Sequence, residues 1–156
     1  MSKILNFSDL GNCPLPTVNY TLVLVGGCFD LLHIGHLFFL EEAKKHGETL
    51  CILLEPDSKL KKKGEGRPIH DQRSRAKILE ALTLVDLIIL LPESVQNKDY
   101  DHAVKLLNPK IIATTENDQN SHHKSRTASL VSAKLVLIPQ YQGHSSTSLI
   151  NKLSEI

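Results

Sequence analysis

Short apolar runs alternate with longer helical segments along most of this chain, and that alternation constrains its fold more than any other feature. The apolar runs, rich in Leu and β-branched residues as buried strands are, cover residues 20–25, 49–54, 86–91, 111–113 and 135–138. Helical patterns cover residues 34–46, 71–82, 100–107 and 146–156. Strands that alternate with helices predict an α/β fold with a mostly parallel, five-stranded sheet and helices on both faces.

The first nineteen residues lack this alternation. Asn12 and Pro14 interrupt them and no period emerges, so residues 1–19 are predicted to be an N-terminal extension. Residues 20–156 are expected to form one domain, because a chain of 156 residues suits a single hydrophobic core. Ligands bind such sheets beyond the carboxyl ends of the strands, so the loops that follow the strands are the places to search for function.

Charge and composition exclude several classes of function. Eighteen basic and 17 acidic residues leave a formal net charge of +1, which gives no electrostatic basis for binding nucleic acid or an anionic membrane. Cys13, Cys28 and Cys51 stand far apart without metal-type spacing, which fits a reducing compartment. No apolar run approaches the ~18 residues of a membrane span. We therefore expect a cytoplasmic protein with no nucleic-acid or membrane partner, in which any anion site is local.

Glycines and histidines follow the first predicted strand in close succession. Gly26 and Gly27 allow a tight turn and a close backbone approach to a ligand. His33 and His36 share one face at the start of a helix, and Gly35 leaves room between them for a bulky phosphate. The free N–H groups and dipole of the helix start favour anions there, and two imidazoles can donate hydrogen bonds to phosphate oxygens as charge develops.

Other interpretations of this histidine pair stay open. The spacing also suits an incidental pair or a zinc site, for which Cys28 is a conceivable third ligand. The glycine turn after a strand favours phosphate, although neither the Walker pattern nor GxGxxG is present.

Three further segments carry groups suited to anions. Residues 59–68, which are rich in Lys and Gly, are either a solvated loop or a mobile set of charges over a triphosphate. Ser145, Ser146 and Thr147 precede or begin the last helix, where they can cap it, a contribution of about 1 kcal/mol, and also surround an anion. The basic cluster at residues 122–126 is either a solvated loop or a further segment that binds an anion.

The stretch GGCFDLLHIGHLFFLEEAKK, residues 26–45, resembles the signature of the HxGH nucleotidyltransferases. That superfamily includes glycerol-3-phosphate and ethanolamine-phosphate cytidylyltransferases and heptose-phosphate adenylyltransferases. The glycines, Phe29-Asp30 and both histidines occur in the family's order, directly after a strand. The resemblance covers roughly residue 20 to the C-terminus and implies a Rossmann-like sheet.

Two other segments extend the resemblance, and two depart from it. Residues 63–68, Lys-Gly-Glu-Gly-Arg-Pro, are followed by Asp71-Gln72-Arg73, as in a loop of heptose-phosphate adenylyltransferases whose last Arg contacts the nucleotide phosphates. Residues 145–147 match a Ser-Thr-Thr segment that binds phosphates in the family. Relatives carry Gly-Asp after the fourth strand, where this chain has Glu116 nearest the acidic position and no glycine. Residues 140–142 lack an Arg found in cytidylyltransferases of the glycerol-phosphate type.

The resemblance implies transfer of a nucleoside monophosphate from ATP or CTP, with ATP slightly favoured, to a small phosphorylated acceptor such as a sugar phosphate or alcohol phosphate, with release of pyrophosphate. It assigns catalytic roles to His33, His36, Lys63 and Arg73. It assigns nucleotide binding to Gly26, Gly27, Cys28, Phe29, Asp30, Gly35, Glu116, Ser145, Ser146 and Thr147. Mg²⁺ is the expected cofactor because triphosphates travel with it, without a dedicated protein cage, and relatives suggest a homodimer.

Two other functions remain open from the sequence. A nucleotide sensor on the same scaffold would bind a triphosphate without producing pyrophosphate, and the altered residues 114–117 leave room for it. A histidine-based metallohydrolase would need a third ligand at a recognised spacing, which the sequence does not offer.

Overall fold

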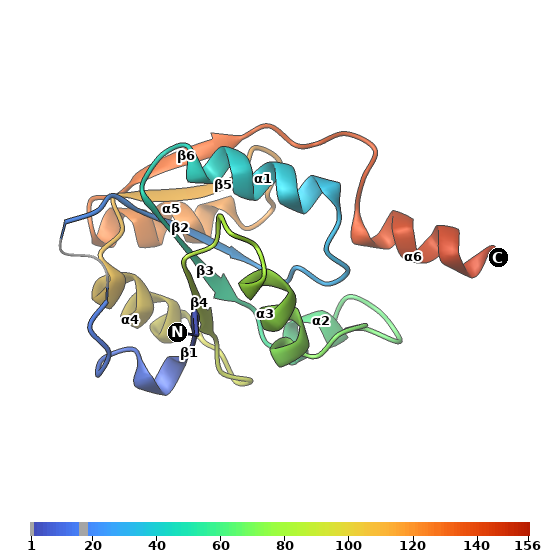
Figure 1. Ribbon diagram of the computed structural model, residues 1–156, viewed down its shortest axis with the longest axis horizontal. Helices are drawn as coiled ribbons and strands as arrows, with labels where there is room; N and C mark the ends of the chain where they lie inside the picture. The colour runs from blue at the N-terminus through green and yellow to red at the C-terminus, as the bar shows by residue number, and fades with distance from the viewer. Residues whose placement is uncertain (1, 16–18) are drawn as a thin grey trace.

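A parallel sheet forms the centre of the computed structural model, which describes residues 2–15 and 19–156 (Figure 1). The strand order is β1-β4-β3-β2-β5-β6, and all neighbouring strands in it run parallel. The strands are β1 (Ile4–Asn6), β2 (Leu22–Gly27), β3 (Thr49–Leu54), β4 (Leu87–Leu90), β5 (Ile111–Thr115) and β6 (Lys134–Ile138). The predicted α/β class with a parallel sheet is confirmed.

The sheet has six strands in the described residues, one more than predicted, because part of the expected N-terminal extension joins it. Residues 4–6 lie beside residues 88–90, and Ile88 donates its N–H to the Lys3 carbonyl at 2.8 Å. A strand of three residues is too short to show a periodic pattern, so the sequence could not reveal it. Residues 16–18 of the expected extension lie outside the described residues.

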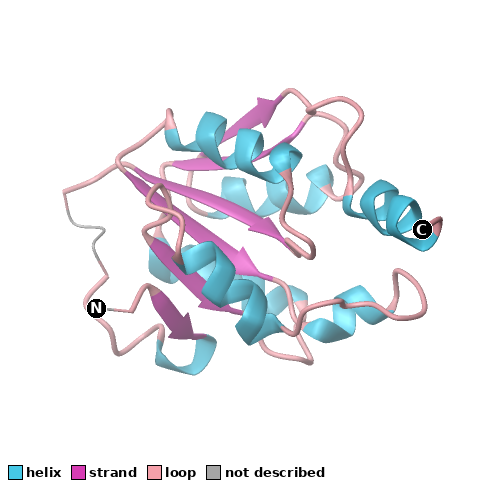
Figure 2. Ribbon diagram, turned by 45° about the vertical axis from the view of Figure 1, so that its right-hand side comes forward, coloured by secondary structure: helices cyan, strands magenta, loops and turns pink. Residues whose placement is uncertain are grey.

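Helices cover both faces of the sheet (Figures 1 and 2). They are η1 (Phe7–Asp9, a 3₁₀ turn), α1 (Ile34–Lys44), α2 (Asp57–Lys61), α3 (Gln72–Glu80), α4 (Asn97–Leu107), α5 (Ser121–Leu130) and α6 (Ser146–Ser154). The buried residues of α1 and α3 pack on one face, and those of α4 and α5 pack on the other. Successive side chains of β2 point to opposite faces of the sheet and so contribute to the hydrophobic core on each face. Val23 and Val25 face α1 and α3, while Leu22 and Leu24 face α4 and α5.

Two of the α-helices occur where no helix was predicted. The α2 helix has only five residues, and three of them are charged, which hides any apolar period. The α5 helix buries only Thr127 and Ala128, so its sequence reads as a polar loop. Both helices lie beside the carboxyl ends of strands, where they shape the loops around the site.

The chain reverses its direction of growth across the sheet at β2. From β2 it runs outward through β3 to β4, and then α4 carries it back so that β5 pairs with the other side of β2. Ligands bind open parallel sheets at such a switch point, outside the carboxyl ends of the strands. The carboxyl ends of β2, β3 and β5 therefore mark the place to look for a site.

Candidate functional site

A pocket of about 670 Å³ opens at this switch point. Its walls come from the carboxyl ends of β2, β3 and β5, the start of α1, the helices α4 and α5, and the segment that leads into α6. Twelve of the fourteen residues predicted for the site line it: Gly26, Gly27, Cys28, Phe29, Asp30, His33, Gly35, His36, Lys63, Ser145, Ser146 and Thr147. Arg73 and Glu116 do not.

The two histidines form the start of α1. His33 is the N-cap residue, and its Nδ1 accepts a hydrogen bond from the Gly35 N–H at 3.0 Å. The His36 Nδ1 lies 3.4 Å from the His33 N–H and accepts from it, which closes a reciprocal cap. The two rings stack with their centroids 3.9 Å apart. Because each Nδ1 is an acceptor, the hydrogen of each neutral ring sits on Nε2, which makes both Nε2–H groups available as donors.

Gly35 is required between these rings. A Cβ atom at this position would lie 2.8 Å from the His33 Cε1 and 3.0 Å from its Nδ1, so any side chain would displace the imidazole. The glycine of the motif therefore allows His33 to fold back over the helix start and cap it.

Burial keeps the histidines neutral. Desolvation, with smaller contributions from the charges of His33 and Lys63, lowers the pKa of His36 to about 3. Burial and the neighbouring His144 also lower the pKa of His33. Two neutral Nε2–H donors beside the N–H groups of a helix start suit an anion. Each Nε2 carries a hydrogen, and neither has to give up an acceptor among the described residues before it binds the anion.

The loop between β2 and α1 is held in a strained conformation. Phe29 and Leu31 have φ angles of 50° and 52°, in the left-handed region that non-glycine residues rarely adopt. A Cβ atom at Gly27 would lie 2.8 Å from the Phe29 ring, so this glycine permits the ring to fold back over the strand end. Non-glycine residues in this region concentrate at functional sites, where the surrounding structure fixes them.

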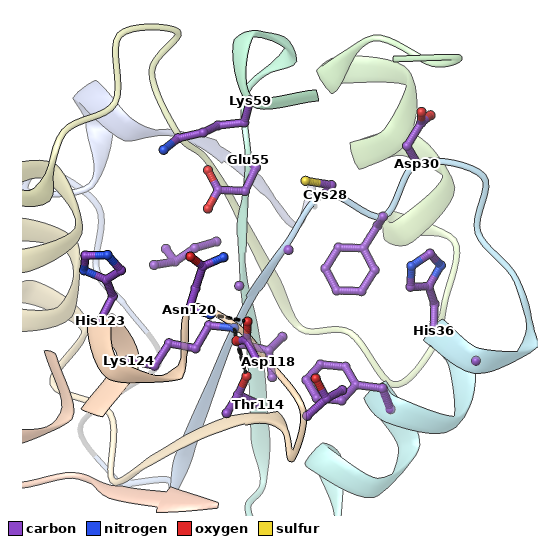
Figure 3. Close-up of a pocket in the computed structure, with 18 of the residues that line it drawn as sticks. Cys28, Asp30, His36, Glu55, Lys59, Thr114, Asp118, Asn120, His123 and Lys124 are labelled. Atoms are coloured by element: carbon purple, nitrogen blue, oxygen red, sulfur yellow. Dashed lines mark hydrogen bonds and ion pairs between the residues drawn. The ribbon is translucent and has the colours of Figure 1, made fainter. Parts of the chain in front are cut away.

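Asp30 holds the next loop in place rather than facing the pocket. Its carboxylate accepts hydrogen bonds from the Arg67 Nε at 3.0 Å and from the N–H groups of Ile69 and His70 at 2.9 and 3.1 Å. Burial alone would raise the pKa of Asp30, but these hydrogen bonds and the Arg67 charge lower it overall. Figure 3 shows the Asp30 carboxylate directed away from His36. Both carboxylate oxygens of Asp30 already accept hydrogen bonds from the protein. Any contact of Asp30 with nucleotide or metal would therefore come from its backbone.

The same residue ties the C-terminal segment to the site. The Ser146 hydroxyl, at the first residue of α6, donates to the Asp30 carbonyl. Ser145 caps α6 by accepting from the Ser148 N–H at 3.0 Å. Asp30 therefore connects three segments that line the pocket: its own loop, residues 67–70 and the start of α6. In Figure 1, α6 otherwise stands apart from the sheet.

Arg73, the arginine predicted for the site, lies outside the pocket, which is lined by Arg67 and Arg126 instead. Arg73 is exposed and donates to the Asn6 Oδ1 at 3.2 Å, outside the pocket. Arg75 is 1% exposed and donates to the carbonyls of Cys28 and Glu55 at 2.6 and 3.0 Å, which fixes the ends of β2 and β3 relative to each other. Arg75 lies four residues before the buried Leu79, and this helical spacing could have identified it.

Cations line the outer part of the pocket. Lys59, Lys63 and Arg67 come from α2 and the loop that follows it. Among the residues that the structure describes, no acidic group pairs with either lysine, and Arg67 uses only its Nε on Asp30. The lysine charges and the terminal nitrogens of Arg67 are therefore free to meet phosphate oxygens.

The acidic residue at the end of β5 is also two positions from the one predicted. Glu116 is exposed and outside the pocket lining, and its N–H donates to the Ile138 carbonyl at 3.0 Å. Asp118 lines the pocket instead, where it pairs with Lys124 and accepts from the Thr114 hydroxyl at 2.6 Å (Figure 3). The turn after β5 directs residue 116 toward β6 and residue 118 back over the strand end, which spacing within the sequence does not reveal.

A second acidic residue in the pocket was not predicted. Glu55 directly follows β3, and the Tyr100 hydroxyl of α4 lies 2.8 Å from both of its carboxylate oxygens. Burial raises the pKa of Glu55, although the Tyr100 hydrogen bond and nearby lysine charges oppose the shift. Forty-five positions separate the two residues, so only the packing of α4 on the sheet brings them together.

The described residues contain no cluster of three His, Cys, Asp or Glu side chains able to hold a metal ion. Across residues 2–15 and 19–156, every helix is too short or too polar to span a bilayer.

Comparison with known proteins finds a family model and several relatives that match most of the chain. The sequence model described as cytidylyltransferase-like matches residues 24–152. Bifunctional protein HldE from Aliarcobacter butzleri is 34% identical over 135 residues, which are 86% of this chain and 27% of that protein. HldE from Campylobacter fetus is 34% identical over 134 residues, 85% of this chain and 28% of that protein. The chain therefore spans little more than a quarter of the length of these relatives.

Solved structures agree with these matches. The lipopolysaccharide core biosynthesis protein from Thermoplasma volcanium has a TM-score of 0.67 and 31% identity, over 80% of this chain and 100% of that one. The pantoate-beta-alanine ligase from Francisella tularensis has a TM-score of 0.64 at 16% identity, over 100% of this chain and 79% of that one, and shares the fold alone.

Proposed function

The chain belongs to the cytidylyltransferase-like family, and from this premise we propose that it is a nucleotidyltransferase, which moves a nucleoside monophosphate from a triphosphate to a phosphorylated acceptor. The observation that carries the proposal is the pair of neutral Nε2–H donors at the start of α1, inside a pocket whose outer wall carries Lys59, Lys63 and Arg67. Neutral donors next to unpaired cations suit a polyanion such as a triphosphate.

The reaction needs few groups from the protein. An oxygen of the acceptor phosphate attacks the α-phosphorus and forms a new P–O bond, while the bond to the oxygen bridging the α- and β-phosphates breaks and pyrophosphate leaves. The attacking phosphate oxygen carries no proton at neutral pH, so no general base is required. The protein supplies position and charge neutralisation.

Named groups of the chain fit these two tasks. His33 and His36 would donate from Nε2 to the oxygens on which charge develops at the α-phosphate and the leaving group. Lys63 and the terminal nitrogens of Arg67 would neutralise the β- and γ-phosphates. Asp30 and Arg75 are positioning residues, because one holds residues 67–70 and the other holds the ends of β2 and β3.

The proposed donor is ATP as its magnesium complex, and the proposed acceptor is a sugar phosphate. Similarity to HldE proteins over about 85% of the chain supports this choice, as does similarity to a protein named for lipopolysaccharide core biosynthesis. The loop Lys63 to Pro68, which resembles that of heptose-phosphate adenylyltransferases, supports it further. CTP remains the alternative donor that an assay must compare.

The proposal is tested by pyrophosphate release with MgCl₂, in which ATP and CTP are each combined with sugar phosphates and alcohol phosphates. We expect release that requires an acceptor and is faster with ATP. Nucleotide binding measured by calorimetry in parallel separates the other outcomes. Tight binding without release from any acceptor would favour a nucleotide sensor, and neither binding nor release would refute the proposal.

A further inference from the structure

The pocket has a second side on which the proposed reaction gives Glu55, Asn120 and His123 no role. Figure 3 shows the end of β2 at Cys28 dividing the pocket, with His36 on one side and Glu55, Lys59, Asn120 and His123 on the other. These residues come from the end of β3, from α2, and from the N-cap and body of α5. They surround an opening on the side away from His36, and the Glu55 carboxylate points into this opening.

Glu55 is fixed in position by its backbone and by one side chain. Its N–H donates to the Gly27 carbonyl at 3.0 Å, and its own carbonyl accepts from the Arg75 Nη1 at 3.0 Å. The Tyr100 hydroxyl, which has a single hydrogen to donate, lies between the two carboxylate oxygens at 2.8 Å from each. Within the described part of the chain, Tyr100 is the only hydrogen-bond partner of the carboxylate.

Most of the acceptor capacity of Glu55 is therefore unused. A carboxylate has about four acceptor positions, and a largely buried one is costly when they stay empty. Burial raises the pKa of this carboxyl group, although the Tyr100 hydrogen bond and three lysine charges oppose the shift. A ligand that brings hydrogen-bond donors to this point would satisfy the carboxylate.

The charges nearby decide which donors fit. Three lysine charges lower the pKa of the Glu55 carboxyl group, those of Lys59, Lys63 and Lys124. Among the described residues, only Lys124 has a carboxylate partner, Asp118. A cationic amine would meet these lysines as like charges, whereas neutral hydroxyl groups would not. The unpaired Lys59 can in turn hold an anionic group of the same ligand. The site thus suits a molecule that carries hydroxyls and a phosphate side by side.

We propose that Glu55, oriented by Tyr100, accepts hydrogen bonds from hydroxyl groups of the sugar-phosphate acceptor and so selects this acceptor over a phosphorylated amine or a simple alkyl phosphate. This inference rests on the proposed function, and it adds a specificity-determining residue to it. Lys59 holds the phosphate side of the same acceptor, and Tyr100 is a positioning residue.

The ribose of the nucleotide also carries two neighbouring hydroxyls and is the other source of this chemistry. The geometry favours the acceptor, because the proposed triphosphate site is at His33 and His36, and Glu55 lies across the β2 end from His36. Nucleotide and acceptor affinities measured separately distinguish the two sources.

The test compares Glu55→Gln and Tyr100→Phe with the unchanged protein. Glu55→Gln keeps the shape but loses the charge and half of the acceptor capacity, and Tyr100→Phe keeps the carboxylate but removes its orienting donor. Glu41→Gln, which changes an exposed carboxylate on α1 outside the pocket lining, is the matched control. The acceptors are mannose phosphate and glycerol phosphate against ethyl phosphate, which has no free hydroxyl. Calorimetry with each acceptor, with ATP and with 2′-deoxy-ATP accompanies the rate measurements, and thermal unfolding checks that each variant is folded.

We expect Glu55→Gln to raise the KM for the polyol phosphates by about 10- to 100-fold, the size of a hydrogen bond to a charged group. The affinity for ATP and the kinetics with ethyl phosphate should change less than about twofold, so the preference for polyols should disappear. Tyr100→Phe should lie between the two, and Glu41→Gln should match the unchanged protein.

Three results would overturn the inference: an unchanged KM for polyol phosphates in Glu55→Gln, an equal loss with ethyl phosphate, or a loss that appears in the affinity for ATP but not for 2′-deoxy-ATP. If no acceptor gives turnover in the unchanged protein, the proposed function fails, and the calorimetry still decides the inference. Polyol phosphate binding that Glu55→Gln weakens would then support the subsite, and absence of such binding would refute it.

Discussion

Asp30 illustrates how one buried carboxylate can organise several loops. It is 1% exposed, and each of its carboxylate oxygens accepts from a donor in residues 67–70. The family motif places an acidic residue directly before the histidine segment, where a metal or nucleotide role is the obvious interpretation. Its surroundings show that its side chain contacts the protein itself, since each donor that it contacts belongs to residues 67–70.

Replacing Asp30 with Asn should therefore damage stability and nucleotide binding together. The change leaves Arg67 without its charged partner in a nearly buried position, which should cost about 3 kcal/mol of the free energy of unfolding. Asp101→Asn breaks a more exposed pair with Arg126 and should cost less than about 1 kcal/mol. Urea unfolding of both variants checks this contrast, and equal losses would contradict the role given to Asp30.

His36 gives the pH dependence of stability a definite direction. Its pKa is about 3 in the folded protein, and the imidazole of an unfolded chain titrates near 6.5. Between these values the unfolded chain binds a proton that the folded chain does not, so the free energy of unfolding rises with pH and levels off above about 6.5. One such group contributes a slope of at most about 1.4 kcal/mol per pH unit.

The variant His36→Asn should flatten that slope between about pH 4.5 and 6.5. His46→Asn, which changes an exposed imidazole at the end of α1, should leave the slope as it is in the unchanged protein. Urea unfolding at a series of pH values measures both. Parallel curves for His36→Asn and the unchanged protein would show that His36 is not held neutral by the fold.

At the scale of elements, the helix phase of α3 decides which of its arginines contacts the ends of β2 and β3. Arg75 shares its face with Ala76 and Leu79 and is directed under the ends of β2 and β3, whereas Arg73 is directed toward solvent and Asn6. The family resemblance matched a triplet of letters and so selected Arg73. Helical periodicity, applied from the buried Leu79, would have selected Arg75.

This difference gives a sharp comparison between neighbouring arginines. Arg75→Ala leaves four acceptors without their donor, three carbonyls and the Asp57 carboxylate, and should destabilise the protein by about 3–5 kcal/mol. Arg73→Ala should change the free energy of unfolding by less than about 0.5 kcal/mol, as surface substitutions do. Its KM for nucleotide should also stay unchanged. A large rise of that KM in Arg73→Ala would restore the role that the resemblance implied.

The sequence also predicts most of the larger elements, for a physical reason. Buried parallel strands such as β3 are continuous apolar runs, and α1 and α4 are long enough to show a period. The sequence does not predict the three-residue β1, the charged α2 or the polar α5, because their boundaries depend on tertiary contacts rather than on a local pattern. The missed elements matter for function, since α2 and α5 carry Lys59 and Lys124 into the pocket.

At the scale of the whole molecule, the site consists of two halves, of which one can be predicted from the sequence and the other cannot. The histidine half is contiguous in the chain, and its motif could be recognised by its resemblance to the family signature. The half around Glu55 and Asp118 is assembled from β3, α4, β5 and α5, which approach one another only after the sheet has formed. Motif reasoning therefore predicts the phosphate chemistry, whereas the acceptor side needs the fold.

The central claim is that the helix-start histidines of this chain catalyse nucleotidyl transfer. The measurement that tests it most directly is acceptor-dependent pyrophosphate release from ATP by the unchanged protein and by His36→Ala, with His46→Ala as control. We expect the unchanged protein and the control to release one pyrophosphate per nucleotidylated acceptor. We expect His36→Ala to lower kcat by at least about 100-fold, as loss of a transition-state donor does, while the fold is kept. Normal turnover by a folded His36→Ala would contradict the account.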